Sequence, residues 1–322
     1  MLSTNAGITY FCSIMKEFDN CQLCPRACGV NRNAGEYGFC RSDAGYHIGS
    51  ICIHRGEEPV INGTKGICNI FFTHCNLQCI YCQNYQISRN LSEAGDNTMA
   101  LEEVVAEVIH CLDQGVDAVG FVTPTHFVPH VKAIVDQLKI RRYNPIKVYN
   151  TNGYDSVETL QSLEGIIDVY LPDLKYADPL LSDRYSGATD YPEMARKAVL
   201  EMYRQKGSSV VVNENGLAVT GLIIRHLVLP GCAEDSIAVL KWIAEELSPS
   251  VSISLMSQYY PTACISGMSE LNRHITPEEY RKVVKAMDDL GFYKGWIQEP
   301  ESSQSYNPDF KRNHPFESNF PA

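Results

Sequence analysis

The alternation of apolar runs with amphipathic segments beyond about residue 69 constrains the fold of this chain most strongly. Six short apolar or β-branched runs are typical of buried parallel strands: residues 69–72, 118–122, 146–150, 167–171, 222–229 and 252–256. Strand-then-helix repeats imply a parallel sheet with right-handed crossovers. Six units fall short of the eight that close a barrel. We therefore expect an α/β fold, a partial, TIM-like (β/α)6 barrel.

Helices are predicted between these strands from apolar residues at helical spacing, over 101–112, 128–138 and 237–247. The last helix has the strongest start signal. Thr276-Pro277-Glu278-Glu279 reads as a capping box with proline in the first turn, and Gly291 follows as a stop. These signals predict a regular barrel layer over most of the chain.

The chain divides into three parts by composition. Residues 1–68 are rich in glycine and cysteine with little periodicity, which predicts a small cap stapled by a second metal site. Residues 69–300 carry the barrel pattern. Residues 301–322 are polar with scattered aromatics, and we expect them to lie along the surface.

Charge and cysteine usage restrict the class of protein. The formal charge is -11 and no Lys/Arg cluster occurs, which disfavours a nucleic-acid partner. The first residues show no basic segment or long apolar run, so we expect no signal peptide, no membrane partner and a cytoplasmic location. Thirteen cysteines in such a compartment indicate metal or redox chemistry rather than disulfides.

Seven of these cysteines fall into two spaced groups, and the first group directly follows a predicted strand. "THCNLQCIYCQN" places Cys75, Cys79 and Cys82 on one loop. Thiolates at this density select zinc or an iron–sulfur cluster. A structural zinc site or a complete [4Fe–4S] site takes four protein ligands. Three cysteines leave one iron of a cluster open, and that iron can bind a substrate or cosubstrate. The remaining six cysteines are expected to be buried thiols: Cys12, Cys52, Cys68, Cys111, Cys232 and Cys264.

The C-x₃-C-x₂-C spacing, with aromatic Tyr81 before the last cysteine, resembles the signature of the radical S-adenosylmethionine (SAM) enzymes. The resemblance implies a [4Fe–4S] cluster whose open iron chelates SAM. It also implies reductive cleavage to a 5′-deoxyadenosyl radical, and so an electron donor resembling flavodoxin or ferredoxin. The alternative is a structural three-cysteine zinc site completed by a distant ligand.

Further segments resemble the activating enzymes of glycyl radical enzymes, such as the pyruvate formate-lyase activating enzyme. They are "FFTHCNLQCIYCQN" with Asn84, "YNTNGY" with Asn152, "YLPDLKY" with Asp173 and Lys175, and "IRHLVLPG" with Arg225. SAM carries a carboxylate, an ammonium and ribose hydroxyls. Lys175 or Arg225 can pair the carboxylate, Asp173 the ammonium or a neighbouring lysine, and Asn152 the ribose. Each charged residue also has a structural reading, as part of a salt bridge.

Two loops depart from the family pattern. The Gly-Gly-Glu segment expected after the second strand reads "VTPTHFVP", where Thr123 and Thr125 offer hydroxyls but no glutamate occurs. The sixth-strand segment reads "SQYYP" in place of Pro-Tyr-His. His126 and His130, beside the first of these loops, are expected to be ordinary polar or helix-start residues rather than catalytic acids.

The second cysteine group, Cys21, Cys24, Cys28 and Cys40, is a complete set of soft-metal ligands. It predicts an auxiliary iron–sulfur cluster or a zinc site. The pattern "CPRACGVNR" followed by "HRGEEP" resembles a subgroup of proteins similar to the activating enzyme. Glu57 and Glu58 of the second segment can face the active site, and we expect at least one of them in a solvated turn.

Three functions follow from the sequence. The chain can generate a glycyl radical on a partner glycyl radical enzyme, or perform the same radical chemistry on a small molecule or peptide. The third is a non-catalytic iron–sulfur or zinc binding module, which would not cleave SAM.

Overall fold

The computed structural model describes residues 15–91, 98–262, 265, 268–299, 308–312 and 314–316. Within these residues, ten strands form one sheet in the order β10-β9-β8-β6-β5-β4-β2-β1-β3, with β7 paired to β8 at the side. The strands are β1 Tyr46–His54, β2 Ile67–Phe72, β3 Thr98–Met99, β4 Ala118–Val122, β5 Ile146–Thr151, β6 Val169–Pro172, β7 Val211–Val212, β8 Ala218–Leu227, β9 Ser252–Met256 and β10 Gly295–Ile297.

The strands from β2 to β10 in this order are parallel, and in the described part of the chain the sheet does not close. The six predicted strands correspond to β2, β4, β5, β6, β8 and β9, so the predicted partial barrel is confirmed. The sequence did not predict β1, which pairs antiparallel with β2 through Ile51 and Ile70 among others. The proposed division at residue 68 stays a prediction, although residues 46–54 belong to the barrel sheet.

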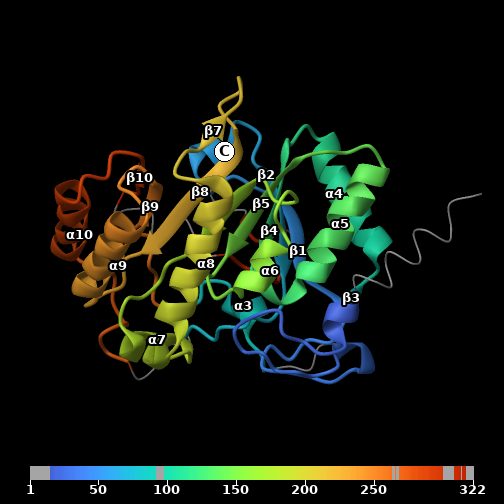
Figure 1. The fold of residues 1–322 in the computed structure, drawn as a ribbon, viewed down its shortest axis with the longest axis horizontal. Coiled ribbons are helices and arrows are strands. Elements are labelled where there is room, and N and C mark those ends of the chain that lie inside the picture. The colour runs from blue at the N-terminus through green and yellow to red at the C-terminus, as the bar shows by residue number, and fades with distance from the viewer. Residues whose placement is uncertain are drawn as a thin grey trace, which may run out of the picture.

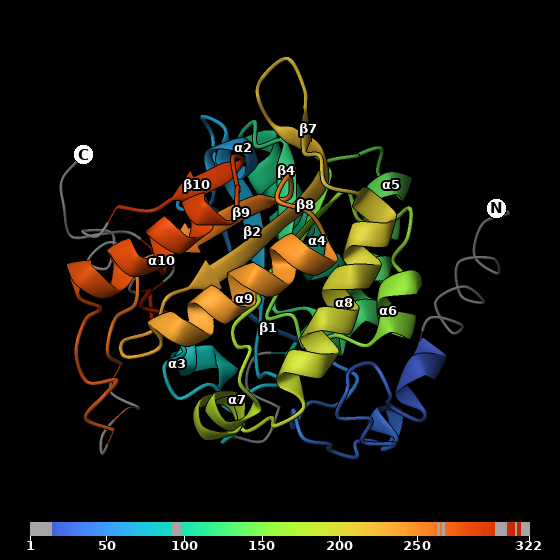
Figure 2. The same ribbon diagram turned by 60° about the vertical axis from the view of Figure 1, so that its left-hand side comes forward.

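Helices pack on the outside of the curved sheet, as Figure 1 and Figure 2 show. The helices are α2 Pro59–Asn62, α3 Tyr85–Ser88, α4 Leu101–Asp113, α5 Val128–Ile140, α6 Val157–Gln161, α7 Pro179–Ser186, α8 Tyr191–Lys206, α9 Ala233–Glu246 and α10 Pro277–Asp289, with short 3₁₀ turns η1 Met15–Phe18, η2 Arg32–Ala34 and η3 Thr125–Phe127. None of the helices in the described ranges is long and apolar enough to cross a membrane.

The predicted capping box of α10 is present. The Thr276 hydroxyl accepts from the Glu279 N–H at 3.2 Å, and the Glu279 carboxylate accepts from the Thr276 N–H at 2.8 Å. The main core lies between the sheet and the helices and is built from residues of both, including Phe121, Ile134, Tyr170, Leu240 and Ile253. This packing fixes the carboxyl ends of the strands, where the pocket lies.

The cysteine-rich segment lies at the same end of the sheet as α3, as both ribbon views show. Buried Arg32 anchors it to the barrel. Its guanidinium donates to the His126 carbonyl at 2.5 Å and to the Asp43 carbonyl at 2.7 Å, and it lies 4.2 Å from the Phe18 ring. The N-terminal segment is therefore held against the barrel by a charged side chain.

The described part of the C-terminal tail contacts β2 and α3. Phe310 and Phe316 pack against Phe71 of β2, with ring centroids at 5.3 and 5.5 Å. The backbone N–H of Phe310 also donates to the Gln86 side chain of α3 at 2.6 Å. That residues 301–322 lie along the surface stays a prediction; in the described part, the rings of Phe310 and Phe316 pack against β2.

Candidate active site

One pocket extends from the carboxyl ends of the parallel strands into the interior of the open barrel. It brings together every residue predicted for the cluster or for SAM: Cys75, Cys79, Tyr81, Cys82, Asn84, Thr123, Asn152, Asp173, Lys175 and Arg225. In α/β sheets this end of the strands is the usual place for a ligand. The parallel topology thus gathers residues that lie up to 150 positions apart in the chain.

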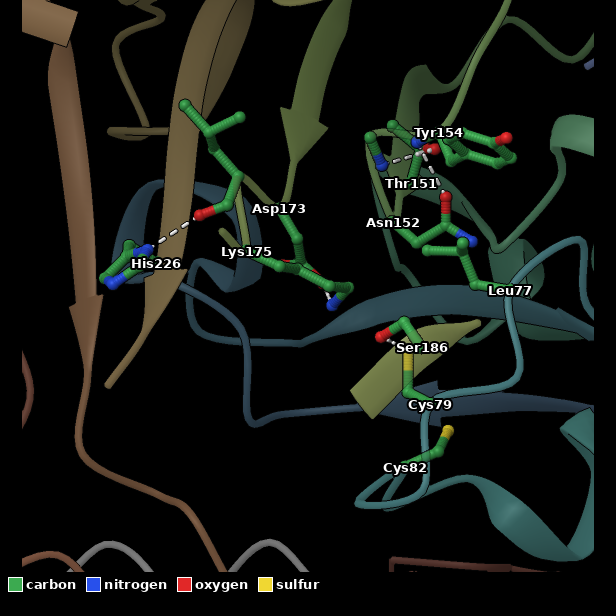
Figure 3. Close-up of polar contacts among 12 residues, drawn as sticks. Leu77, Cys79, Cys82, Thr151, Asn152, Tyr154, Asp173, Lys175, Ser186 and His226 are labelled. Atoms are coloured by element: carbon green, nitrogen blue, oxygen red, sulfur yellow. Dashed lines mark hydrogen bonds and ion pairs between the residues drawn. The ribbon is translucent and has the colours of Figure 1, made fainter. Parts of the chain in front are cut away.

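The three cysteines of the loop after β2 receive hydrogen bonds at sulfur. Cys75 accepts from the Leu77 N–H and from the Asn152 amide, each at 3.3 Å. Ser186 of α7 donates to Cys79 at 3.0 Å (Figure 3), and Ser88 of α3 donates to Cys82 at 3.2 Å. Such donors favour the thiolate over the thiol.

Burial opposes the charged form of two of these thiols, Cys75 and Cys82. It raises the pKa of Cys75 and of Cys82, and the nearby Cys79 sulfur raises both further. The Lys175 ammonium lowers the pKa of Cys82 by less than burial raises it, so without a metal the thiols of Cys75 and Cys82 stay protonated at neutral pH. A bound metal reverses this balance, because thiolates are the form that binds metal.

The donor set fits an iron–sulfur cluster by its chemistry. Three soft sulfur atoms face one pocket and have hydrogen-bond donors in place. Within the described ranges, no three His, Cys, Asp or Glu side chains are arranged to hold one single metal ion. A cluster imposes a different arrangement, since each thiolate binds a different iron.

Two residues at the pocket have backbone conformations that side chains rarely adopt. His74, next to Cys75, has φ 61°, and Thr123, directly after β4, has φ 54°. Non-glycine residues at positive φ store strain and occur often at functional sites. The strain at Thr123 lies in the loop where the family pattern is altered.

Lys175 is a cation beside the cysteine loop, and Figure 3 shows it directed toward the side where Cys79 and Cys82 lie. Its ammonium contacts the Asp173 carboxylate at 2.6 Å. Burial alone lowers the pKa of Lys175, but Asp173 and the Cys79 sulfur raise it above its usual value. The lysine therefore stays charged and keeps donors for a second anion.

The Thr-Asn-Gly segment after β5 packs directly on the Asp-x-Lys segment after β6. A Cβ on Gly153 would lie 2.3 Å from the Asp173 carbonyl oxygen, and Gly153 has φ 81°. The Tyr191 hydroxyl joins both segments, donating to the carbonyls of Asn152 and Asp173 at 2.9 Å. Only glycine allows this contact.

Asn152 lies at the cysteine loop. Its amide donates to Cys75 Sγ and to the Asn76 side chain at 2.8 Å, and its oxygen accepts from the Tyr154 N–H at 2.9 Å. Its predicted contact with a ribose stays a prediction. Nothing in the motif indicated that the Asn152 amide donates to Cys75 Sγ or to the Asn76 side chain.

Arg225 lines the pocket but its guanidinium already pairs with two buried carboxylates. It donates to Glu58 at 2.8 and 2.6 Å and also to Glu57. The expectation that one of these glutamates lies in a solvated turn is wrong, because both side chains are at most 8% exposed. Lys175 is therefore the freer cation for a ligand carboxylate.

The rest of the pocket wall includes Tyr81, Asn84 and Gln258 of the "SQYYP" segment. The Tyr81 hydroxyl accepts from Tyr176 at 2.7 Å. Asn84 precedes α3, and Gln258 of "SQYYP" lines the pocket and accepts from Gln83 at 2.9 Å. The altered segment thus still faces the same space as the cysteine loop.

His126 and His130 do not line this pocket in the described structure. Both are buried, and their Nε2 atoms contact the carbonyls of Thr73 and Ala44 at 3.0 Å. Burial lowers the pKa of both, that of His126 to about 3. The His130 ring thus joins α5 to the N-terminal segment, whereas the His126 ring joins η3 to the loop after β2.

The four N-terminal cysteines surround a second, small cavity. Cys21, Cys24, Cys28 and Cys40 all line it, together with Arg32 and Asn76. Burial raises the pKa of Cys24 to about 12, and it raises that of Cys40 as well. Of the other predicted buried thiols, Cys52, Cys68, Cys111 and Cys232 are buried, whereas Cys12 and Cys264 lie outside the described residues.

Comparison with known proteins gives three kinds of similarity. A family model described as the radical SAM superfamily matches residues 69–225. The chain is 30% identical over 278 residues to Uncharacterized protein MJ0674 of Methanocaldococcus jannaschii, covering 83% of this chain and 74% of that protein. It is 24% identical over 314 residues to Uncharacterized protein MJ0808 of the same organism, with 90% and 84% covered.

Among solved structures, SuiB of Streptococcus suis bound to S-adenosylmethionine is similar at 13% identity and a TM-score of 0.46. The match covers 67% of this chain and 45% of SuiB, so this chain spans about half the length of that protein. A domain of the pyruvate-formate lyase-activating enzyme from Bacteroides vulgatus is similar at 16% identity and a TM-score of 0.39, with 53% and 93% covered.

Proposed function

The chain belongs to the radical SAM superfamily, and from this premise we propose that it reductively cleaves SAM and activates a glycyl radical enzyme. The observation that carries the proposal is the single pocket shared by three cysteines of one loop and by the Lys175–Asp173 pair. A [4Fe–4S] cluster with one open iron supplies, when bound, the electron that breaks the sulfonium S–C bond of SAM and yields a 5′-deoxyadenosyl radical. The chain's own residues bind the cluster and SAM and hold them in a fixed orientation.

Each residue of the pocket has a role in this proposal. Cys75, Cys79 and Cys82 hold the cluster. Lys175 pairs the carboxylate of SAM, and Asp173 fixes the lysine and offers an oxygen to the SAM ammonium. Asn152 keeps the Cys75 sulfur in a fixed orientation through its amide donor.

Activation of a partner protein is supported by the motif resemblances and by the open sheet. A polypeptide loop needs a side entry, and the unpaired edges of the sheet between β3 and β10 leave the barrel open. In the proposed reaction the radical takes a hydrogen atom from a glycine Cα of the partner. A donor resembling flavodoxin or ferredoxin supplies the electron.

A second candidate, radical chemistry on a small molecule or peptide, is favoured by one observation. Pro308 and Phe316 of this chain's own C-terminal tail line the pocket. A tail that covers part of the opening favours a small substrate. The non-catalytic module is the third candidate, and SAM cleavage excludes it.

Two measurements test the proposal. Anaerobically reconstituted protein with dithionite and SAM is expected to form 5′-deoxyadenosine and methionine, and a lack of turnover contradicts every catalytic candidate. Incubation with glycyl radical enzymes from the same genome is expected to give a stable glycyl radical in the electron paramagnetic resonance (EPR) spectrum. SAM cleavage without that radical on any of them favours the second candidate.

A further inference from the structure

The pocket continues past the proposed SAM site toward the opposite end of the barrel. Glu57, which lines it, accepts a hydrogen bond from the Asn69 amide of β2 at 2.8 Å. Asn69 lies about 10 Å before the carboxyl end of β2 at Phe72, and the cysteine loop begins beyond that end. The deep end of the pocket is therefore separate from the residues that hold the cluster and SAM in the proposed function.

Two parts of the chain build this deep end. Glu57 and Glu58 directly precede α2. Arg225 of β8 pairs in register with Ser254 of β9, and Ser254 pairs with Trp296 of β10, so these three residues form one row across neighbouring strands. All five residues line the pocket, and together they are called the deep site.

The deep site has one more carboxylate than cation. Glu58 accepts from Arg225 Nε and Nη2 at 2.8 and 2.6 Å, and Glu57 also accepts from Nη2. Although burial raises the pKa of Glu57, Arg225 and His54 lower it to about 2, so this carboxyl is ionised at neutral pH. Of the lysines and arginines that the structure describes, only Arg225 forms an ion pair with either glutamate. One negative charge is therefore left over.

His54 does not supply the missing positive charge. Its Nε2 lies 4.0 Å from Glu57 Oε1, but burial lowers the pKa of the ring, which stays neutral at neutral pH. The residue is 7% exposed and lines the pocket, and its Nδ1 has no hydrogen-bond partner within the described part of the chain. With hydrogen on the Nε2 that faces Glu57, Nδ1 is an acceptor, which suits an N–H donor of a ligand.

The groups at the other end of the pocket balance one another. Lys175 pairs with Asp173. Three thiolates around a doubly positive [4Fe–4S] core leave one negative charge, and the sulfonium of SAM offsets it, because the SAM ammonium and carboxylate cancel. A buried charge without a partner is costly. A cation from outside the chain therefore stabilises the deep site.

The surroundings favour an organic cation over a metal ion. Trp296 packs against the apolar cluster of Ile61 and Ile67, which closes the amino end of the strands. Ammonium and guanidinium groups bind to the face of a tryptophan ring and donate to carboxylates. No three His, Cys, Asp or Glu side chains in the described ranges are arranged to hold a metal ion.

We propose that the deep site binds an alkylammonium or guanidinium group of the substrate. This rests on the proposed function, in which the cluster and SAM occupy the other end of the same pocket. If the substrate is a partner protein, the group is a lysine or arginine side chain near the reacting glycine. If the substrate is a small molecule, the group is part of a free amine or guanidine.

The first test compares two probes of the same shape by anaerobic titration calorimetry. The full chain is reconstituted and saturated with SAM, without a reductant, so that SAM covers Asp173 and no turnover occurs. n-Butylammonium is expected to bind at least about 10-fold more tightly than n-butanol, because its hydrogen bonds are made to charged acceptors. Equal affinity of the two probes overturns the inference.

The second test changes the carboxylates of the deep site. Glu57→Gln and Glu58→Gln are each expected to weaken n-butylammonium binding at least about 10-fold and to leave n-butanol binding unchanged. Glu201→Gln is the matched control, because Glu201 is equally buried, pairs with Arg204 and lies outside the pocket lining. Unchanged affinity in both deep-site variants overturns the inference. The comparison of probes needs wild type alone and decides the matter if the variants fail to fold.

A third titration distinguishes the two sources of the cation. The probes are the peptide acetyl-Gly-Lys-Gly-amide and its analogue with norleucine in place of lysine. Tighter binding of the lysine peptide than of n-butylammonium supports the inference with a polypeptide as the source. Tighter binding of n-butylammonium supports it with a small molecule as the source. Equal binding of the lysine and norleucine peptides overturns the polypeptide source.

These outcomes separate the inference from the proposed function. A protein that cleaves SAM but binds n-butylammonium and n-butanol equally overturns only the inference. A protein that prefers n-butylammonium but does not cleave SAM overturns only the proposed function. If SAM does not bind, the titration is run without it, and the Glu57→Gln and Glu58→Gln variants still show whether the amine binds at the deep site.

Discussion

Cysteine residues in this chain differ in what their sulfur atoms contact. Cys79 receives a hydrogen bond from Ser186 and faces the pocket beside Lys175. Cys52, by contrast, packs in a small apolar cluster with Phe71 and Val122. Replacing each of these two cysteines with alanine therefore distinguishes a cluster ligand from a thiol that only packs in the core.

The rate of SAM cleavage is expected to fall at least about 100-fold in the Cys79→Ala variant. Replacing a residue that only hydrogen-bonds to a metal ligand already lowers metal affinity or activity about 10- to 100-fold. The Cys52→Ala control is expected to keep the wild-type rate per folded chain. Anaerobic formation of 5′-deoxyadenosine measures both. Cleavage retained in Cys79→Ala shows that the three-cysteine site is misassigned.

The buried carboxylate of Glu57 is expected to make the protein less stable in acid. Burial raises the pKa of this carboxyl, but Arg225 and His54 lower it more, from 4.5 to about 2. Its contribution to stability is thus fully present above about pH 4.5 and is lost as the pH falls toward 2.

Thermal melting between about pH 6 and pH 2, a range that spans both pKa values, measures this contribution to stability. The Glu57→Gln variant is expected to be less stable at pH 6 and to lose less stability in acid than the wild type. The exposed Glu245→Gln variant is the control and is expected to follow the wild type. If the stability of Glu57→Gln depends on pH as that of the wild type does, the result contradicts the ion pair of Glu57 with Arg225.

At the level of elements, the contact between the segments after β5 and β6 depends on one glycine. Gly153 and Gly165 both have positive φ, 81° and 76°, but a Cβ on Gly165 would meet nothing within 4 Å. Comparing the two positions separates backbone strain from the steric clash with Asp173.

The Gly165→Ala variant is expected to lose about 1 kcal/mol of unfolding free energy from strain alone. Gly153→Ala is expected to lose at least about 2 kcal/mol more, because the Asp173 backbone must move. Urea unfolding monitored by circular dichroism measures both values. Equal losses would mean that the two segments are not in rigid contact.

Much of the barrel was predictable because buried parallel strands are short apolar runs. The strand at 118–122 was predicted to the residue. β1 was missed because "YHIGSICIH" mixes histidines and glycine with apolar residues, and its pairing to β2 depends on distant contacts.

In the site, spacing alone identified Cys75, Cys79 and Cys82 as a group. The role of Arg225 could not be read from the sequence. Its two partners, Glu57 and Glu58, lie more than 160 positions away, and only the fold brings them together. Likewise, nothing in the sequence around Arg32 indicates that its side chain is buried against His126.

At the scale of the whole molecule, the N-terminal segment, the barrel and the described tail all contact the cysteine loop or the pocket. Replacing Arg32 with Met is expected to destabilise the chain by at least about 2 kcal/mol, because buried carbonyls lose their donors. It is also expected to speed proteolytic cleavage within residues 15–45. The exposed Arg41→Met variant is the control. Unchanged cleavage in Arg32→Met contradicts the anchoring role.

The central claim is that three thiolates leave one iron of the cluster free for SAM. Electron–nuclear double resonance on the reduced protein with SAM labelled by ¹⁵N at its amino group and ¹⁷O at its carboxylate tests it most directly. The account predicts that hyperfine couplings to both labels appear. Absence of both couplings, with a nitrogen or sulfur of the protein bound at the fourth position, contradicts it.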